Sequence, residues 1–218
     1  MERQILVVLP HPDDESFGIS GSLAWHIGQG TPVTYVCLTL GEMGRNMGNP
    51  LMANRVTLPA IRKKELEESC RAIGITDLRL MGLHDKTIEF EDQEKLIQRL
   101  SAIINELNPS LIITFYPGYS VHPDHDATGV AVIRTVERLP EDKRPVVHCV
   151  AFSNGCEEII GPPDVLNDVS AFLKQKIGSI AAHHSQFQLQ WLLGGKTIED
   201  KEIQDRLSRE RFWTYRFN

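Results

Sequence analysis

The stretch that decides the fold is ILVVLPHPDDE, residues 5–15 of a chain of 218 residues. Its first half is an unbroken run of five apolar side chains, which is typical of a strand buried on both faces. Its second half places an imidazole and three carboxylic acids directly after that strand. Because open α/β sheets bind their ligands beyond the carboxyl ends of the strands, this position indicates a functional site.

A second motif has the same layout later in the chain. The apolar run at residues 111–115 predicts another buried strand, and the sequence HPDH follows it at residues 122–125. A single His-Pro-Asp at the end of a strand is typical of a turn in which the acid caps the next helix. Two such motifs after two strands are far more specific for a shared site than either motif alone.

The spacing of apolar residues predicts the fold class. Strands and helices alternate, which favours a mainly parallel sheet with helices on both faces. Right-handed crossovers then favour the Rossmann-like strand order 3-2-1-4-5, in which both motifs leave from one crevice. No repeat or linker divides the chain, so we expect one domain over residues 1–218. The expected strands are 5–9, 33–40, 78–81, 111–115, 146–151 and 212–217; the expected helices are 16–28, 58–73, 93–107, 126–139, 171–183 and 199–209; the expected loops are 41–54 and 152–167.

The bulk composition excludes several classes of protein. A net charge of −6 argues against a duplex nucleic-acid binder, which usually carries a basic face. The sequence shows neither a signal peptide nor a membrane span, so we expect a cytoplasmic protein without a membrane partner. The cysteines form no Cys-x-x-Cys pair and are expected to be small buried residues rather than disulfides. They are Cys37, Cys70, Cys149 and Cys156.

The two motifs contain a plausible ligand set for zinc. Catalytic zinc takes about three protein ligands and keeps one position open for water, and His11, Asp14 and His125 can supply that set. Ligands of this kind also accept Fe²⁺, Co²⁺ or Mn²⁺. Zinc lowers the pKa of its bound water to about 7. Asp13, beside the ligands, is then the candidate general base.

The other acids and imidazoles in and around the motifs have candidate roles. His122 can stabilise an oxyanion or protonate a leaving amine, and Asp124 can orient an imidazole. Glu15 is expected to lie at the N-terminus of the first helix, where its negative charge interacts favourably with the positive end of the helix dipole. Asp85 follows the third strand and is a weaker candidate for the pocket. The pair at 183–184 ends a helix and fits either the site or simple capping.

Two alternatives come from another class, that of proteins without catalysis. A nucleotide-binding Rossmann protein needs Gly-x-Gly-x-x-Gly at the first strand-to-helix turn. That turn holds carboxylates here, and these would repel a pyrophosphate. A protein that binds metal but catalyses nothing is the second alternative. It predicts bound zinc and no release of an amine from any acetamide.

The pair of motifs resembles those of the PIG-L/LmbE-type zinc-dependent N-acetylglucosaminyl deacetylases. The resemblance covers the chain to about residue 186 and implies a Rossmann-like fold. It also implies zinc on His11, Asp14 and His125, with Asp13 as general base. His122 would then be the group that stabilises the tetrahedral intermediate.

The same resemblance bears on the substrate. The family's Arg-x-x-Glu corresponds to residues 62–65 and implies that Arg62 contacts the substrate; a solvated basic helix face is the alternative. The chain looks most like the bacillithiol branch, which deacetylates N-acetylglucosaminyl malate. Another glucosamine conjugate or a mercapturate-type acetamide is the alternative substrate. Arg45 and Arg55 are candidates for the malate end, and related enzymes imply a homotrimer or hexamer.

Overall fold

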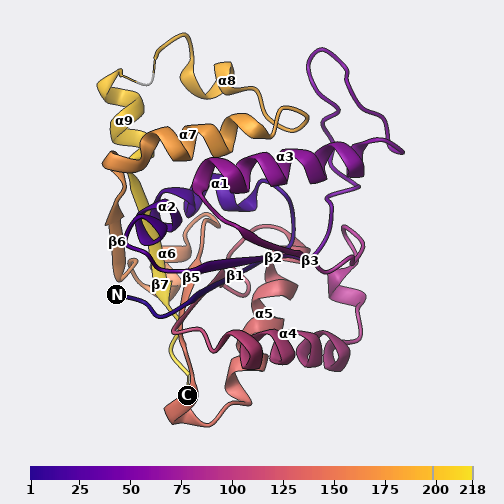
Figure 1. Ribbon diagram of the computed structural model, residues 1–218, viewed down its shortest axis with the longest axis vertical. Coiled ribbons are helices and arrows are strands. Elements are labelled where there is room, and N and C mark those ends of the chain that lie inside the picture. Colours follow the sequence, from indigo (N-terminus) through magenta and orange to yellow (C-terminus); the bar gives the residue numbers. More distant parts are fainter. Residues whose placement is uncertain (198, 218) are drawn as a thin grey trace.

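A β-sheet forms the centre of the protein (Figure 1). The computed structural model describes residues 1–197 and 199–217, and in this part seven strands lie in the order β3-β2-β1-β4-β5-β7-β6. The predicted α/β fold with the order 3-2-1-4-5 is therefore confirmed. The strands are β1 Ile5–Leu9, β2 Val33–Cys37, β3 Asp77–Leu80, β4 Leu111–Phe115, β5 Val146–Val150, β6 Val165–Asp168 and β7 Arg209–Thr214.

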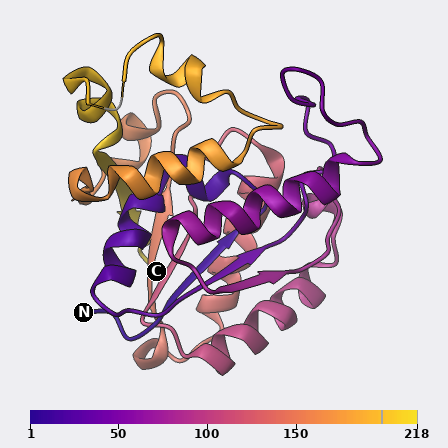
Figure 2. The ribbon, with the colours of Figure 1, turned by 45° about the horizontal axis from the view of Figure 1, so that its top comes forward.

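Helices cover both faces of the sheet. Figures 1 and 2 show α2, α3 and α7 on one face and α4 and α5 on the other. The shorter helices α6, α8 and α9 belong to the C-terminal part of the chain. The helices are α1 Asp14–Gly18, α2 Ser20–Gly28, α3 Leu58–Ile73, α4 Gln93–Leu107, α5 Pro123–Glu137, α6 Cys156–Ile160, α7 Leu173–Ala182, α8 Leu189–Leu193 and α9 Lys201–Leu207.

The first strand is apolar at every position because it contributes to two cores. Ile5, Val7 and Leu9 belong to the core under α2 and α3, and Leu6 and Val8 belong to the core under α4 and α5. Successive side chains of a strand point to opposite faces of the sheet, so burial on both faces removes any polar alternation. The five residues are at most 1% exposed.

The position of β1 brings the two sequence motifs to one edge of the sheet. β1 pairs in parallel with β2 on one side and with β4 on the other, with Ile5 opposite Leu111. Parallel strands end at the same edge, so the segments after β1 and β4 leave the sheet side by side. This is the arrangement that the strand order predicted.

The C-terminal part differs from the prediction. The expected loop 152–167 contains α6 and the start of β6, and both β6 and β5 pair antiparallel with β7. β6 is short, and its alternate residues are exposed, so it lacks the apolar run that marks a buried strand. The terminal strand begins at Arg209 rather than Phe212, and the preceding helix is correspondingly shorter. The first helix is also interrupted, at Ile19.

Two further expectations concern single features of the chain. The four cysteines are free and buried, as the sequence indicated. Among the described residues, no helix is both long enough and apolar enough to cross a membrane.

Helix α5, which carries three of the four residues of the second motif, packs closely against the end of β4. A Cβ added at Gly129 would lie 2.4 Å from the carbonyl oxygen of Phe115. Backbone cannot move aside as a flexible side chain can, so only glycine allows this approach. The contact holds the N-terminal half of α5 against the end of β4, the strand that precedes the second motif.

Gly129→Ala is therefore expected to destabilise the protein, although alanine is the better helix former. Overpacking of this kind typically costs about 1–3 kcal/mol of unfolding free energy. Urea unfolding measures the change, and Arg134→Ala, exposed on the same helix, is the control with an expected change within about 0.5 kcal/mol. An unchanged or raised stability of Gly129→Ala would contradict the close packing.

Candidate active site

The two motifs meet through their side chains at the carboxyl ends of β1 and β4. The imidazole Nε2 of His11 lies 3.1 Å from Oδ2 of Asp124, and Nε2 of His125 lies 3.2 Å from Oδ1 of Asp14. Each motif thus contributes one histidine and one aspartate to the other. The structure brings together all the residues that the sequence proposed as metal ligands.

Asp14 lies between the two imidazoles. Its Oδ2 lies 3.4 Å from Nδ1 of His11 and accepts a hydrogen bond from the His11 backbone amide at 2.8 Å. Burial alone would raise the pKa of Asp14, but His125 and His11 hold it well below its usual range. The carboxylate is therefore ionised and available as a ligand, as a metal site requires.

The remaining hydrogen bonds orient both imidazoles for metal binding. Nδ1 of His125 lies 2.9 Å from the carbonyl oxygen of Ser120 and donates to it, so Nε2, which faces Asp14, is the nitrogen whose proton a metal ion would replace. His11 has the opposite orientation: Nε2 faces the carboxylates of Asp124 and Asp85, and Nδ1 faces Asp14. A histidine that gives its second N–H to a carboxylate or carbonyl is the usual arrangement of a metal ligand. Asp14 contacts both His11 and His125, and carboxylate oxygens of Asp85 and Asp124 also come within 4.8 Å of a ligand atom of His11.

His122 lies beside these residues but is oriented differently. Ligand atoms of His11, His122 and His125 come within 4.8 Å of one another, so distance alone admits His122 as a ligand. However, Nδ1 of His122 accepts a hydrogen bond from the backbone amide of Asp124 at 3.1 Å. The neutral ring then carries its proton on Nε2 and is a donor there. Burial, followed by the nearby His11 and His125, lowers the pKa of His122 and favours this neutral form.

Asp13 has a strained backbone that the surrounding side chains hold in place. Its φ is 102°, in the left-handed region that costs about 1–3 kcal/mol for a residue other than glycine. The carboxylate of Glu15 accepts a hydrogen bond from the Asp13 amide at 3.1 Å, and Arg62 donates to Asp13 Oδ2 at 2.9 Å. Burial raises the pKa of Asp13 to about 6, against the opposing effect of Arg62.

Arg62 is a buried residue and not part of a solvated helix face. It is 3% exposed and donates to the carbonyl oxygens of Gly41, at 2.8 Å, and Pro12. A Cβ at Gly41 would collide with the guanidinium, and Gly41 has a φ of 62°. Within the described residues, the Nε of Arg62 has no hydrogen-bond partner. Arg62 therefore joins the loop after β2 to the first motif.

Behind the first motif lies a polar network that the sequence did not reveal. Glu15 is fully buried, and its carboxylate receives hydrogen bonds from His183 at 2.7 Å and from Ser69 and Tyr35. Burial alone would raise the pKa of Glu15, but His183 lowers it, and the two form a buried ion pair. Glu15 lies in the first turn of α1, as expected, yet it also holds the backbone of Asp13. In the sequence, the feature that pointed to this network was the pair of adjacent histidines at residues 183–184.

Two further acids anchor loops around the site. Asp85 contacts His11 through Oδ1, and its Oδ2 accepts from the amide of Met43 at 2.8 Å. Glu65 accepts from both the amide and the hydroxyl of Ser185, each at 2.7 Å. The two contacts tie the loop after β2 and the segment after α7 to the rim of the site.

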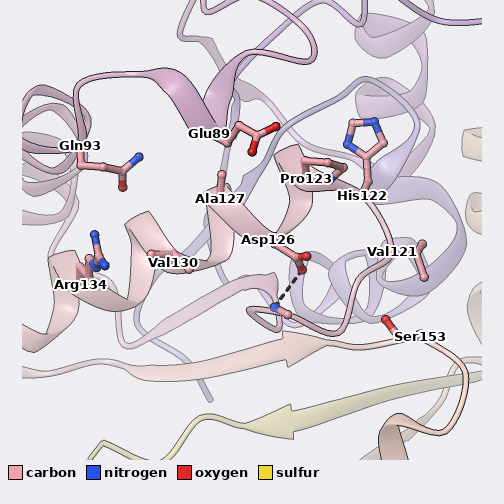
Figure 3. Close-up of a pocket in the computed structure, with 11 residues that line it drawn as sticks. Glu89, Gln93, Val121, His122, Pro123, Asp126, Ala127, Val130, Arg134 and Ser153 are labelled. Atoms are coloured by element: carbon pink, nitrogen blue, oxygen red, sulfur yellow. Dashed lines mark hydrogen bonds between the residues drawn. The ribbon is translucent and has the colours of Figure 1, made fainter.

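The side chains described above surround an open cavity of about 710 Å³. Its floor is formed by the two motifs, and its rim by the loops after β2 and β3. A second cavity, of about 690 Å³, adjoins it along α5 and shares His122 and Glu89 with it. Figure 3 shows this second cavity, with His122 at one end and Arg134 at the other. Asp13, Arg62, Asp85 and the candidate ligands all line the first cavity.

A Rossmann-like sheet with histidines and aspartates gathered beyond the carboxyl ends of its strands defines a protein with a candidate site for metal-dependent chemistry. The comparison with known families agrees. The PIG-L model, described as GlcNAc-PI de-N-acetylase, matches residues 6–136, which is more than half of the chain. The chain belongs to the PIG-L family.

Relatives are similar over the whole length of the chain. The probable N-acetyl-alpha-D-glucosaminyl L-malate deacetylase 2 of Bacillus cereus is 49% identical over 219 residues, which cover 100% of both chains.

Solved structures share the fold at lower identity. The N,N'-diacetylchitobiose deacetylase from Pyrococcus horikoshii has a TM-score of 0.74 at 24% identity and covers 98% of this chain and 84% of its own. The 4-carboxy-2-hydroxymuconate hydratase from Pseudomonas putida KT2440 has a TM-score of 0.76 at 16% identity and covers 99% and 97%. Since a deacetylase and a hydratase both match, the fold alone does not select the reaction.

The buried pair of Glu15 and His183 predicts a large difference between two adjacent histidines. His183→Ala leaves the carboxylate buried without its cation, which typically costs about 3–5 kcal/mol. His184→Ala, at an exposed position, is expected to change stability by no more than about 0.5 kcal/mol. Urea unfolding of the two variants measures both values. Similar unfolding free energies of the two variants would contradict the predicted cost of leaving the Glu15 carboxylate buried without His183.

Proposed function

We propose that this protein is a metal-dependent deacetylase that removes the acetyl group from N-acetyl-α-D-glucosaminyl L-malate and releases acetate. One observation carries the proposal: the histidines and aspartates of both motifs meet in one open cavity. The chain that forms this cavity is 49% identical over its full length to a relative with that name. The residues of the motifs supply the chemistry, and the relative indicates the substrate.

The proposed ion is zinc, held by Nδ1 of His11, the carboxylate of Asp14 and Nε2 of His125. When bound, a divalent ion acts as a Lewis acid on the amide carbonyl and lowers the pKa of the attacking water. The proton on the second nitrogen of each imidazole is held by Asp124 or by the Ser120 carbonyl. These contacts support the ligand set over one that includes His122.

Asp13 is the proposed general base. Arg62 occupies its Oδ2, so Oδ1 is the atom that takes the proton from the attacking water. The left-handed backbone at Asp13 sets this carboxylate apart from Asp14, although the two are adjacent in the chain. A base whose pKa lies near the working pH transfers protons efficiently in both directions.

His122 is the proposed oxyanion donor. With Nδ1 occupied by the Asp124 amide, its Nε2–H is free to donate to the carbonyl oxygen as negative charge develops there. The bond between the carbonyl carbon and nitrogen then breaks, and the proton held by Asp13 passes to the leaving amine. One water and one amide thus give acetate and an amine.

The same proposal includes the residues that contact the sugar, the assembly of the protein and its domain organisation. Arg62 and Asp85 line the cavity and are the proposed contacts to the sugar. A homotrimer or hexamer in the cytoplasm is the proposed assembly. Residues 1–218 are proposed to act as one domain.

The proposal is tested with three acetamides: N-acetylglucosaminyl malate, methyl N-acetylglucosaminide and an S-substituted N-acetylcysteine. Release of the amine is measured with and without a chelator. We expect metal-dependent hydrolysis, with the highest kcat/KM for the malate conjugate. A preference for the cysteine derivative would identify a mercapturate-type deacetylase. Bound metal without hydrolysis of any of the three would identify a protein that binds metal without this catalysis.

The proposed roles of Asp13 and His125 predict that two inactive variants differ in their metal content. Asp13→Asn is expected to retain metal and to lose about 10²–10⁴-fold in kcat, because an amide cannot accept the proton. His125→Ala is expected to lose metal as well as activity. Elemental analysis and steady-state kinetics separate the two effects. Full metal content in His125→Ala, or loss of metal in Asp13→Asn, would contradict the assignment.

A further inference from the structure

The cavity must accept an anion although its floor is acidic. Asp13, Asp14 and Asp85 line it, and malate would add two more carboxylates. The cations beside these acids are already paired with them, so a dicarboxylate needs basic groups other than those of the floor. The inference below rests on the proposed function, since it concerns how that substrate is recognised.

Two of the arginines near the cavity are already engaged. Arg62 is buried and binds Asp13 and two backbone carbonyls. Nη1 of Arg55 donates to the carbonyl oxygens of Glu42 and Gly44, at 2.9 and 2.8 Å, and Arg55 does not line the cavity. Arg55, a candidate for the malate end, supports the loop after β2 instead.

Arg45 and Lys86 differ from those arginines. Both line the cavity, both are exposed, and the side chain of neither makes a hydrogen bond or ion pair with any residue of the described part of the chain. An exposed cation near several carboxylates commonly pairs with one of them. These two remain free because the acids on the floor are held by histidines, Arg62 and backbone amides.

The backbone beneath each of these cations is held in place. Next to Arg45, Nδ2 of Asn46 donates to the backbone carbonyl oxygen of Gln186 at 2.7 Å, and Nε2 of Gln186 donates to the backbone carbonyl oxygen of Asn46 at 3.0 Å. The amide of Lys86 donates to Asp124 Oδ2 at 2.6 Å, and Lys86 has a φ of 66°. The side chains can therefore adjust to a ligand while their Cα positions stay fixed.

We propose that Arg45 and Lys86 form an anion subsite that binds the two carboxylates of the malate group. Arg45 presents a planar fork that matches one carboxylate in a bidentate manner, and Lys86 is a point charge for the other. They lie on different loops, after β2 and after β3, so one dicarboxylate held by both must sit across the cavity rather than along α5. Along α5 the adjoining cavity is lined by two acids, Glu89 and Asp126, against one cation, Arg134, and this balance disfavours a dicarboxylate there.

The test compares a charged and an uncharged aglycone in the same holoenzyme. N-acetylglucosaminyl malate and methyl N-acetylglucosaminide are assayed with Arg45→Gln, Lys86→Gln and the double variant. Each single substitution is expected to lower the ratio of kcat/KM for malate over methyl conjugate by about tenfold or more, through KM. Lys64→Gln, an exposed lysine of α3 outside the cavity, removes the same charge and should leave the ratio unchanged.

A second measurement does not depend on turnover of the malate conjugate. Free L-malate should inhibit hydrolysis of the methyl glycoside, more weakly in both variants than in the wild type and more weakly at high salt. An unchanged ratio in both variants, while the wild type prefers the malate conjugate, would overturn the subsite alone. Absence of any hydrolysis of the malate conjugate by the wild type would instead overturn the proposed function. Metal content and circular dichroism of each variant verify that it is folded and loaded.

Discussion

The hydrogen bond between His11 and Asp124 joins the two motifs, and the geometry of the site depends on it. The carboxylate of Asp124 is fully buried and also receives the backbone amides of Lys86 and Ile88. One side chain therefore connects the exits of β1, β3 and β4. Such a carboxylate is ionised because three donors surround it, and it in turn sets which nitrogen of His11 faces the site.

Buried charges are concentrated around the first motif, and each has an opposite charge beside it. Asp14 lies against His11 and His125, Glu15 against His183, and Asp13 against Arg62. A buried ion pair is weak evidence of stability, because desolvation offsets most of the attraction. The value of these pairs lies in position: they hold three consecutive acids in three different environments, so that neighbours in the chain can perform different chemistry.

The fold supports this site without determining the reaction. A hydratase matches the fold with a TM-score of 0.76, and a deacetylase matches it with 0.74. What distinguishes them must lie in the side chains at the carboxyl ends of the strands and in the loops that surround them. In this protein the loop after β2 brings Arg45 to the cavity, and the loop after β3 brings Asp85 and Lys86.

The sequence by itself determined the order of the first five strands, the edge of the sheet at which the site lies, and the two motifs that form the site. Apolar runs such as residues 5–9 mark strands buried on both faces, and the handedness of crossovers leaves few possible orders. It did not reveal β6, whose four residues lack an apolar run. Only the tertiary structure decided that Glu15 pairs with His183, that Arg62 is buried, and that the side chain of Arg45, unlike that of Arg55, has no partner within residues 1–197 and 199–217. These contacts join residues from separate elements, and no local pattern encodes which polar groups meet across a fold.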